Sequence, residues 1–109
     1  MSFEAVAGQW REGERRITQA SASEQPVLRR VTDALVDELR RRLGGSFTAR
    51  ELAQLYLDQG TDWCFAIATR VAPDRPEAWD LTTVAGAAFA RYLREASDYG
   101  GGTVIADQE

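Results

Sequence analysis

The sequence predicts an all-α fold, a compact bundle of about five helices. Apolar residues recur three and four positions apart along most of the 109 residues, and no long segment alternates with the period of two of a half-buried strand. Glycine, proline and capping residues divide these apolar stripes into segments of helical length. Two cores would leave each half of the chain too small to bury enough apolar surface. We therefore predict one helical domain over residues 1–99 and a flexible tail over residues 100–109.

Two amphipathic helices are expected in the N-terminal half. The first covers residues 3–20, and its apolar side chains recur at roughly helical spacing: Phe3, Val6, Ala7, Trp10 and Ile17. The second follows Pro26 and carries a stripe with spacings of three and four: Leu28, Val31, Leu35, Leu39 and Leu43. Most charged residues of the second helix fall on the opposite face, and Gly44 and Gly45 supply its end.

A helix-turn-helix-like pair is predicted over residues 48–71. Thr48 and Glu51 have the spacing of a capping box, and apolar residues occupy the hydrophobic-staple positions that flank it. The helix that starts there is expected to end at Gly60. The following helix is apolar nearly all round, which is typical of an element buried on most sides. We therefore expect this second helix to form the centre of the core.

The last helix is expected to run to about Tyr99. Asp74 and Glu77 repeat the capping-box spacing, and Asp80 offers a second capping position a few residues later. Small residues in the middle of this helix favour close approach of a neighbouring helix: Ala85, Gly86, Ala88 and Ala90.

The composition argues against most familiar active sites. The chain has no histidine and no lysine, which removes the commonest general base and metal ligand and the Schiff-base nucleophile. Cys64 lies between two aromatic residues and is the only cysteine, so a disulfide or a cysteine metal site within one chain is excluded. We expect a structural thiol, no cofactor, no metal and no enzymatic activity.

The same features bear on where the protein acts. A lone cysteine fits a reducing compartment, and the N-terminal residues have neither the apolar core of a signal peptide nor the length of a membrane span. A cytoplasmic protein without membrane contact is therefore expected. The net charge of −4 disfavours non-specific binding to nucleic acid, because the phosphate backbone is bound through clustered positive charge.

Two alternative functions stay open at this point. The pair over residues 48–71 would suit a DNA-binding regulator, although its second helix offers few side chains that could read bases. Carboxylates around Trp63 and Trp79 would suit a small-molecule sensor or a minor enzyme, although Asp58, Asp62 and Asp80 are also explained as turn or capping residues.

A protein-binding surface is the leading hypothesis. Trp10 lies in a polar, weakly helical segment between two glycines, where its ring either caps the core or anchors a partner. Arginine and tryptophan are enriched in interface hot spots, although arginines interleaved with acids also form ordinary salt-bridged faces. The candidate interaction residues are Trp10, Arg11, Arg15, Arg16, Arg40 and Arg41.

Several segments together resemble a group of small, functionally uncharacterised helical proteins of actinobacteria: QWREGERR, GSFTARELAQLY, GTDWCFAIA and AAFARYLREASDYGG. The resemblance implies a helical fold and carries no activity, cofactor or site residue. The sequence therefore predicts a non-enzymatic module that binds another protein or itself, as an accessory factor in a regulatory or transcription-related assembly.

Overall fold

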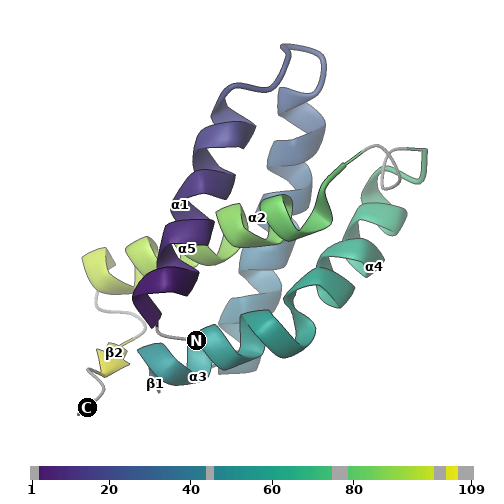
Figure 1. Cartoon of the computed structure of the whole chain (residues 1–109). Coiled ribbons are helices and arrows are strands. Elements are labelled where there is room, and N and C mark those ends of the chain that lie inside the picture. Colours follow the sequence, from purple (N-terminus) through teal and green to yellow (C-terminus); the bar gives the residue numbers. More distant parts are fainter. Residues whose placement is uncertain (1–2, 44–45, 75–78, 100–102, 106–109) are drawn as a thin grey trace.

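The computed structural model describes residues 3–43, 46–74, 79–99 and 103–105, and it is an all-α bundle (Figure 1). Within these ranges the predicted helices are present: α1 (Phe3–Thr18), α2 (Gln25–Leu43), α3 (Ala49–Leu55), α4 (Thr61–Val71) and α5 (Leu81–Tyr99). A π-helical turn, η1 (Tyr56–Gly60), joins α3 to α4. The predicted all-α class is confirmed.

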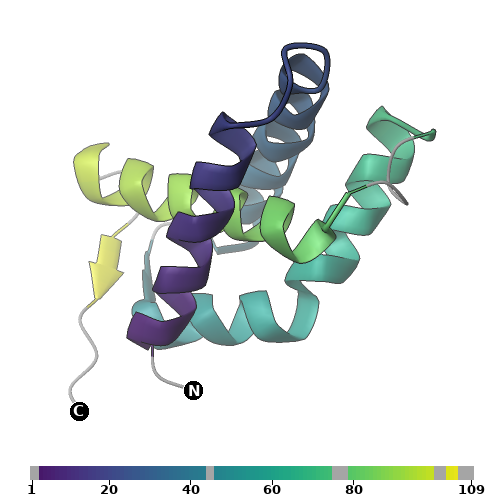
Figure 2. The same ribbon diagram turned by 45° about the horizontal axis from the view of Figure 1, so that its top comes forward.

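Helix α5 is the central element of the bundle. It passes between α1 on one side and α2 on the other, while α3, η1 and α4 together wrap around its lower and right-hand sides in Figure 1. Figure 2, turned about the horizontal axis, shows the same crossing of α1 over α5. Helices α1, α2 and α4 all pack against α5, and α4 packs against α2 as well.

Two glycines allow α1 and α5 to cross closely. A Cβ atom on Gly13 would overlap the Thr83 carbonyl oxygen and lie 3.2 Å from the Ala87 nitrogen. A Cβ on Gly86 would lie 3.3 Å from the Cα of Trp10. Gly86, one of the small residues predicted to permit close helix approach in α5, thus lies against α1.

The capping box at the start of α3 is confirmed. The Glu51 backbone N–H donates to the Thr48 Oγ1 over 3.0 Å, and the Thr48 backbone N–H donates to the Glu51 carboxylate over 3.1 Å. Phe47 and Leu52, in the staple positions, are both buried. Local sequence alone therefore determines where this helix begins.

Replacing Thr48 by alanine is expected to lower the free energy of unfolding by about 1 kcal/mol, because the Glu51 N–H loses its acceptor. Urea unfolding followed by far-UV circular dichroism measures this. Thr48→Ser keeps the hydroxyl and is the matched control, expected to unfold within a few tenths of a kcal/mol of the wild type. Equal losses in both variants would contradict a capping role.

The prediction that Gly60 ends a helix is wrong. Gly60 and Thr61 both have right-handed helical backbone angles, so the chain passes from α3 through η1 into α4 without leaving the helical region. Gly60 serves packing instead: a Cβ there would lie 3.1 Å from the Tyr56 ring and 3.6 Å from Phe89. The predicted pair over residues 48–71 exists, but a π turn replaces the expected loop.

Helix α5 begins at the later of the two predicted caps. The Asp80 carboxylate accepts the Thr82 N–H over 3.1 Å and the Thr83 hydroxyl over 2.9 Å, so Asp80 caps α5. Asp74 lies in a turn seven residues before Leu81, which excludes it as the cap of this helix. Glu77 lies outside the described residues.

A short strand pair was not expected from the sequence. β1 (Ser46–Thr48) pairs in parallel with β2 (Thr103–Ile105), with Phe47 opposite Val104. Strands of three residues are too short to leave an alternating apolar pattern. Part of the segment predicted as a flexible tail over residues 100–109 is therefore paired with β1.

Candidate functional site

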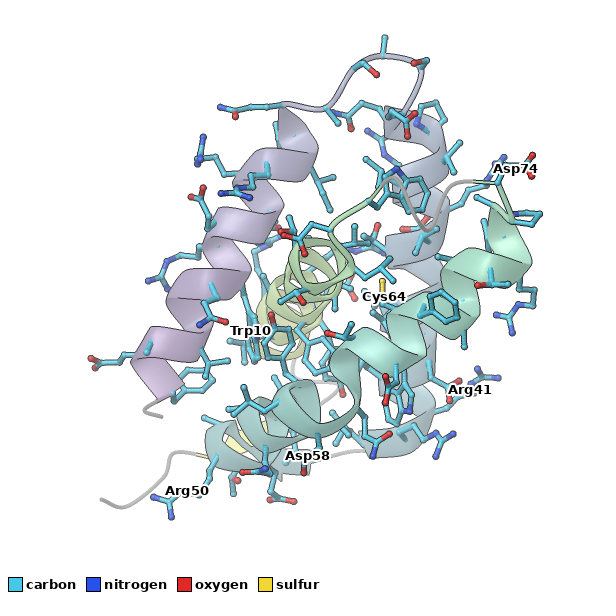
Figure 3. The ribbon with its side chains drawn as sticks, turned by 45° about the vertical axis from the view of Figure 1, so that its right-hand side comes forward. Trp10, Arg41, Arg50, Asp58, Cys64 and Asp74 are labelled. Carbon is cyan, nitrogen blue, oxygen red and sulfur yellow. The ribbon has the colours of Figure 1, made fainter. Side chains whose placement is uncertain are left out.

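Trp10 belongs to the core and not to an interface. Its side chain lies on the inner side of α1, toward α5 (Figure 3), and is 1% exposed. The centre of its ring is 5.5 Å from that of Tyr56 and 5.5 Å from that of Phe89, while Phe3 packs edge-on against it at 5.8 Å. A ring enclosed in this way cannot anchor a partner, which decides between the two interpretations of Trp10.

The candidate arginines of α1 are held by an acid of the same helix. Arg15 and Arg16 both contact the Glu12 carboxylate, the second over 3.2 Å. Hydrogen bonds from Arg15 and then Arg16 lower the pKa of Glu12 to about 2. Arg11 is exposed and has no ion pair with any described residue. Exposed pairs of this kind contribute little to stability, so they form an ordinary charged face.

The candidate arginines of α2 are also paired. Arg40 bridges Asp37 on its own helix and Glu95 on α5, each over 2.5 Å. Arg41 contacts Glu38 and projects away from the bundle in Figure 3. These side chains remain accessible, but their charges are already met by acids, and a role in partner binding stays a prediction.

Helix α4 is exposed along its outer side, contrary to the expectation that it lies at the centre of the core. Cys64, Ile67 and Ala68 face the bundle, while Phe65 is 52% exposed. On the preceding η1, Leu57 is 47% exposed. These two are the large apolar side chains that the described part of the chain leaves exposed.

We call this surface the η1–α4 face and define it by the exposed side chains Leu57, Asp58, Thr61, Asp62 and Phe65. Its acids are on the outside: Asp58 points away from the bundle in Figure 3 and accepts a hydrogen bond from Gln54 over 2.9 Å. The face thus combines two apolar side chains with two carboxylates.

Sequence reasoning missed Phe65 because it weighed the number of apolar residues and not their positions. Cys64, Ile67, Ala68 and Val71 form an i, i+3, i+4, i+7 stripe, and Phe65 falls beside that stripe. The stripe was therefore the signal that could have placed Phe65 outside the core. Leu57 had no such signal, because its position depends on the π turn.

A cation–π contact joins Trp63 of α4 to Arg42 of α2. The Arg42 guanidinium lies 4.9 Å from the centre of the half-buried Trp63 ring, and Arg42 also contacts Glu38 over 2.8 Å. Such a contact contributes about 0.5–1 kcal/mol at an exposed site. Trp63 is therefore tied to α2 and is less available to a partner than Phe65.

The helical pair offers poor chemistry for DNA. Its charged residues are two arginines and three acids, which gives residues 48–71 a net charge of −1: Arg50, Glu51, Asp58, Asp62 and Arg70. DNA binders neutralise phosphates with clustered positive charge and read bases with several polar side chains of one helix. The outer side of α4 exposes a single arginine, Arg70, together with Asp62 and the apolar Phe65 and Ala66.

Two of the carboxylates considered for catalysis, Asp58 and Asp80, have structural partners. Asp80 caps α5, and the Trp79 indole N–H donates to the Glu24 carboxylate over 2.9 Å. The hollow beside Trp79 and Asp80 is small, at about 190 Å³. Within the ranges that the structure describes, no three histidine, cysteine, aspartate or glutamate side chains cluster in a way that could hold a metal ion.

Cys64 is a buried thiol on the inner side of α4 (Figure 3). Burial in apolar surroundings raises its pKa to about 12. A thiol with so high a pKa is almost wholly protonated at neutral pH and is a poor nucleophile or metal ligand.

This raised pKa predicts a loss of stability at alkaline pH. Above pH 9 the unfolded thiol releases its proton while the folded one keeps it, so the stability is full below pH 9 and falls until the folded thiol titrates at about 12. Wild-type protein is expected to lose about 1 kcal/mol more per pH unit than Cys64→Ala in this window. Burial also raises the pKa of Tyr56 and Tyr92, so the variant keeps a shallower slope.

Urea unfolding at several pH values between 8 and 11 measures both slopes, and the difference in slope is the relevant quantity because Cys64→Ala loses packing at every pH. Parallel slopes would contradict the assignment of Cys64 as the buried titrating group.

Comparison with known proteins returned no matching family model, no matching curated protein and no matching solved structure. None of the described helices is both long enough and apolar enough to span a bilayer.

Proposed function

We propose that this protein is a non-enzymatic helical module that acts by binding protein through its η1–α4 face. The observation that carries the proposal is the exposure of Leu57 and Phe65, since the other large apolar side chains described by the structure are buried or partly buried. Exposed apolar patches with a polar border mark interaction sites more often than a random surface does. Asp58 and Asp62 provide that border.

The π turn supports the same choice of face. Such turns interrupt α-helices rarely and are frequent at functional sites, and η1 carries Leu57 and leads directly into α4. The predicted interaction surface thus moves from the arginines of α1 and α2 to the side of the bundle formed by η1 and α4. A cytoplasmic accessory factor in a regulatory assembly is the narrower form of the proposal.

Affinity capture from a lysate of the source organism tests the proposal. The chain is immobilised through a tag, and bound proteins are identified and quantified by mass spectrometry for wild type and for Leu57→Ser with Phe65→Ser. Both positions are about half exposed, so the double variant should keep its stability. Arg11→Ser is the matched control, because Arg11 is exposed on α1 and has no ion pair with a described residue.

The expected result is a bound protein that the wild type and Arg11→Ser retain and the double variant loses at least about tenfold, which corresponds to 1.4 kcal/mol of binding energy. Capture that is equal for all three proteins would refute the η1–α4 face as the binding surface.

A further inference from the structure

Arg29 and Arg30 differ from most arginines of the described chain, because neither forms an ion pair there. The arginines that do form ion pairs with described acids are Arg15, Arg16, Arg40, Arg41, Arg42, Arg91 and Arg94. Arg29 and Arg30 on α2 are exposed, and neither guanidinium contacts an acid of the described residues. They therefore present two charges that nothing in the described part of the bundle neutralises.

The same two side chains line a hollow in the surface. It has a volume of about 470 Å³ and is formed at the start of α2 by Ala22, Gln25, Pro26, Arg29, Arg30 and Asp33. Ala22, Pro26 and the aliphatic stems of the arginines give it apolar walls, and arginine stems cover apolar surface in this way elsewhere in proteins. An apolar side chain with a carboxylate close by would suit such a hollow.

The η1–α4 face supplies that chemistry. Phe65 projects from α4, and Asp62 lies three residues earlier, which is one turn away on the same helix. The carboxylate of Asp58 follows on η1. An exposed aromatic ring beside two acids is thus complementary to an apolar hollow beside two arginines that no described acid pairs with.

We propose that the occupant of this hollow is a second copy of the chain, with Phe65 of one molecule between Arg29 and Arg30 of the next and Asp62 facing their guanidinium groups. The inference rests on the proposed function of the η1–α4 face and names its partner. Helix α4 and the start of α2 stand apart in both ribbon views (Figure 1, Figure 2), so one molecule offers both surfaces at once. Such a head-to-tail contact extends to further copies unless its rotation closes a ring.

Sedimentation velocity over a series of protein concentrations tests this. Wild type is expected to form larger species as concentration rises and to lose them with added salt, because exposed charges are screened. Phe65→Ser removes the inserted ring and keeps the hollow, while Arg29→Glu with Arg30→Glu removes the hollow's charge and keeps the ring. Each variant alone should associate at least about tenfold more weakly than wild type.

The mixture of the two variants is the decisive sample. One partner contributes an intact ring and the other an intact hollow, so an equimolar mixture should form a species of two chains that neither variant forms alone. Arg11→Glu reverses a charge away from both surfaces and should associate like wild type. Circular dichroism checks that all variants are folded.

Monomeric wild type at every concentration, or a mixture that stays monomeric, would overturn self-association. If a different protein is still captured through Leu57 and Phe65, the proposed function stands without this inference. If wild type is monomeric and nothing is captured through that face, both fail.

Discussion

Replacing Trp10 by alanine is expected to lower the free energy of unfolding by about 3–5 kcal/mol, the usual loss for a large aromatic side chain removed from a packed core. The ring is 1% exposed and lies within 5.8 Å, centre to centre, of the rings of Phe3, Tyr56 and Phe89. Its removal leaves a cavity between α1, η1 and α5, because these three elements meet at that ring. Small domains have total free energies of unfolding of about 5–15 kcal/mol, so this loss is a large fraction of the total stability.

Trp10→Phe separates the ring from its N–H group. The Trp10 Nε1 is buried and has no hydrogen-bond partner among the described residues, so phenylalanine removes an unsatisfied donor while it keeps an aromatic ring. The smaller phenylalanine ring loses packing, but the loss of the unsatisfied N–H removes a desolvation cost of about 1–3 kcal/mol. We therefore expect the free energy of unfolding to change by no more than about 1.5 kcal/mol. Urea unfolding followed by far-UV circular dichroism measures both variants. A loss below about 1 kcal/mol for the alanine variant would place Trp10 outside the core.

Gly13→Ala is the second substitution with a large expected effect. The added methyl group would overlap the Thr83 carbonyl oxygen and approach the Ala87 nitrogen to 3.2 Å, and both atoms belong to the backbone of α5. The backbone of α5 cannot rotate away as a side chain can, so α1 and α5 must separate. We expect a net loss of about 1–3 kcal/mol, even though alanine is the better helix former.

Gly8→Ala, in the same helix, is the matched control. Among the described residues, a Cβ on Gly8 would meet only the flexible end of Arg11, at 3.9 Å. This substitution should therefore stabilise the protein by about 0.5–1 kcal/mol through helix propensity alone. Thermal unfolding of the two variants beside wild type measures the contrast. Shifts of the same sign for Gly8→Ala and Gly13→Ala would show that the α1–α5 crossing is looser than the structure has it.

The sequence predicts those features that local chemistry determines. The capping box of Thr48 and Glu51 starts α3 because both partners are three residues apart, and the stripe from Leu28 to Leu39 buries one side of α2 because its spacing matches the helical turn. The cap at Asp80 is predictable for the same local reason, because its carboxylate accepts the N–H of a residue two positions later.

Features that depend on distant parts of the chain could not be predicted in this way. Glycine at a helix end and glycine at a close packing contact are identical in sequence, so the sequence predicts a helix end at Gly60, although Gly60 lies against Tyr56 and Phe89. The burial of Trp10 could not be predicted either, because Trp10 lies in a polar segment between two glycines. Only the crossing of α1 with α5 shows what covers its ring.

The π turn of η1 sets the rotation of α4 about its own axis relative to α3. A π turn contains one more residue than the α turn that it replaces, so η1 is equivalent to a one-residue insertion between α3 and α4. Each residue of an α-helix advances the side-chain direction by about 100°, so removing Gln59 would rotate all of α4 by that angle relative to α3. Such a rotation would turn Cys64 and Ala68 away from their buried positions. The surplus residue therefore decides which side of α4 faces the core and which side is left for a partner.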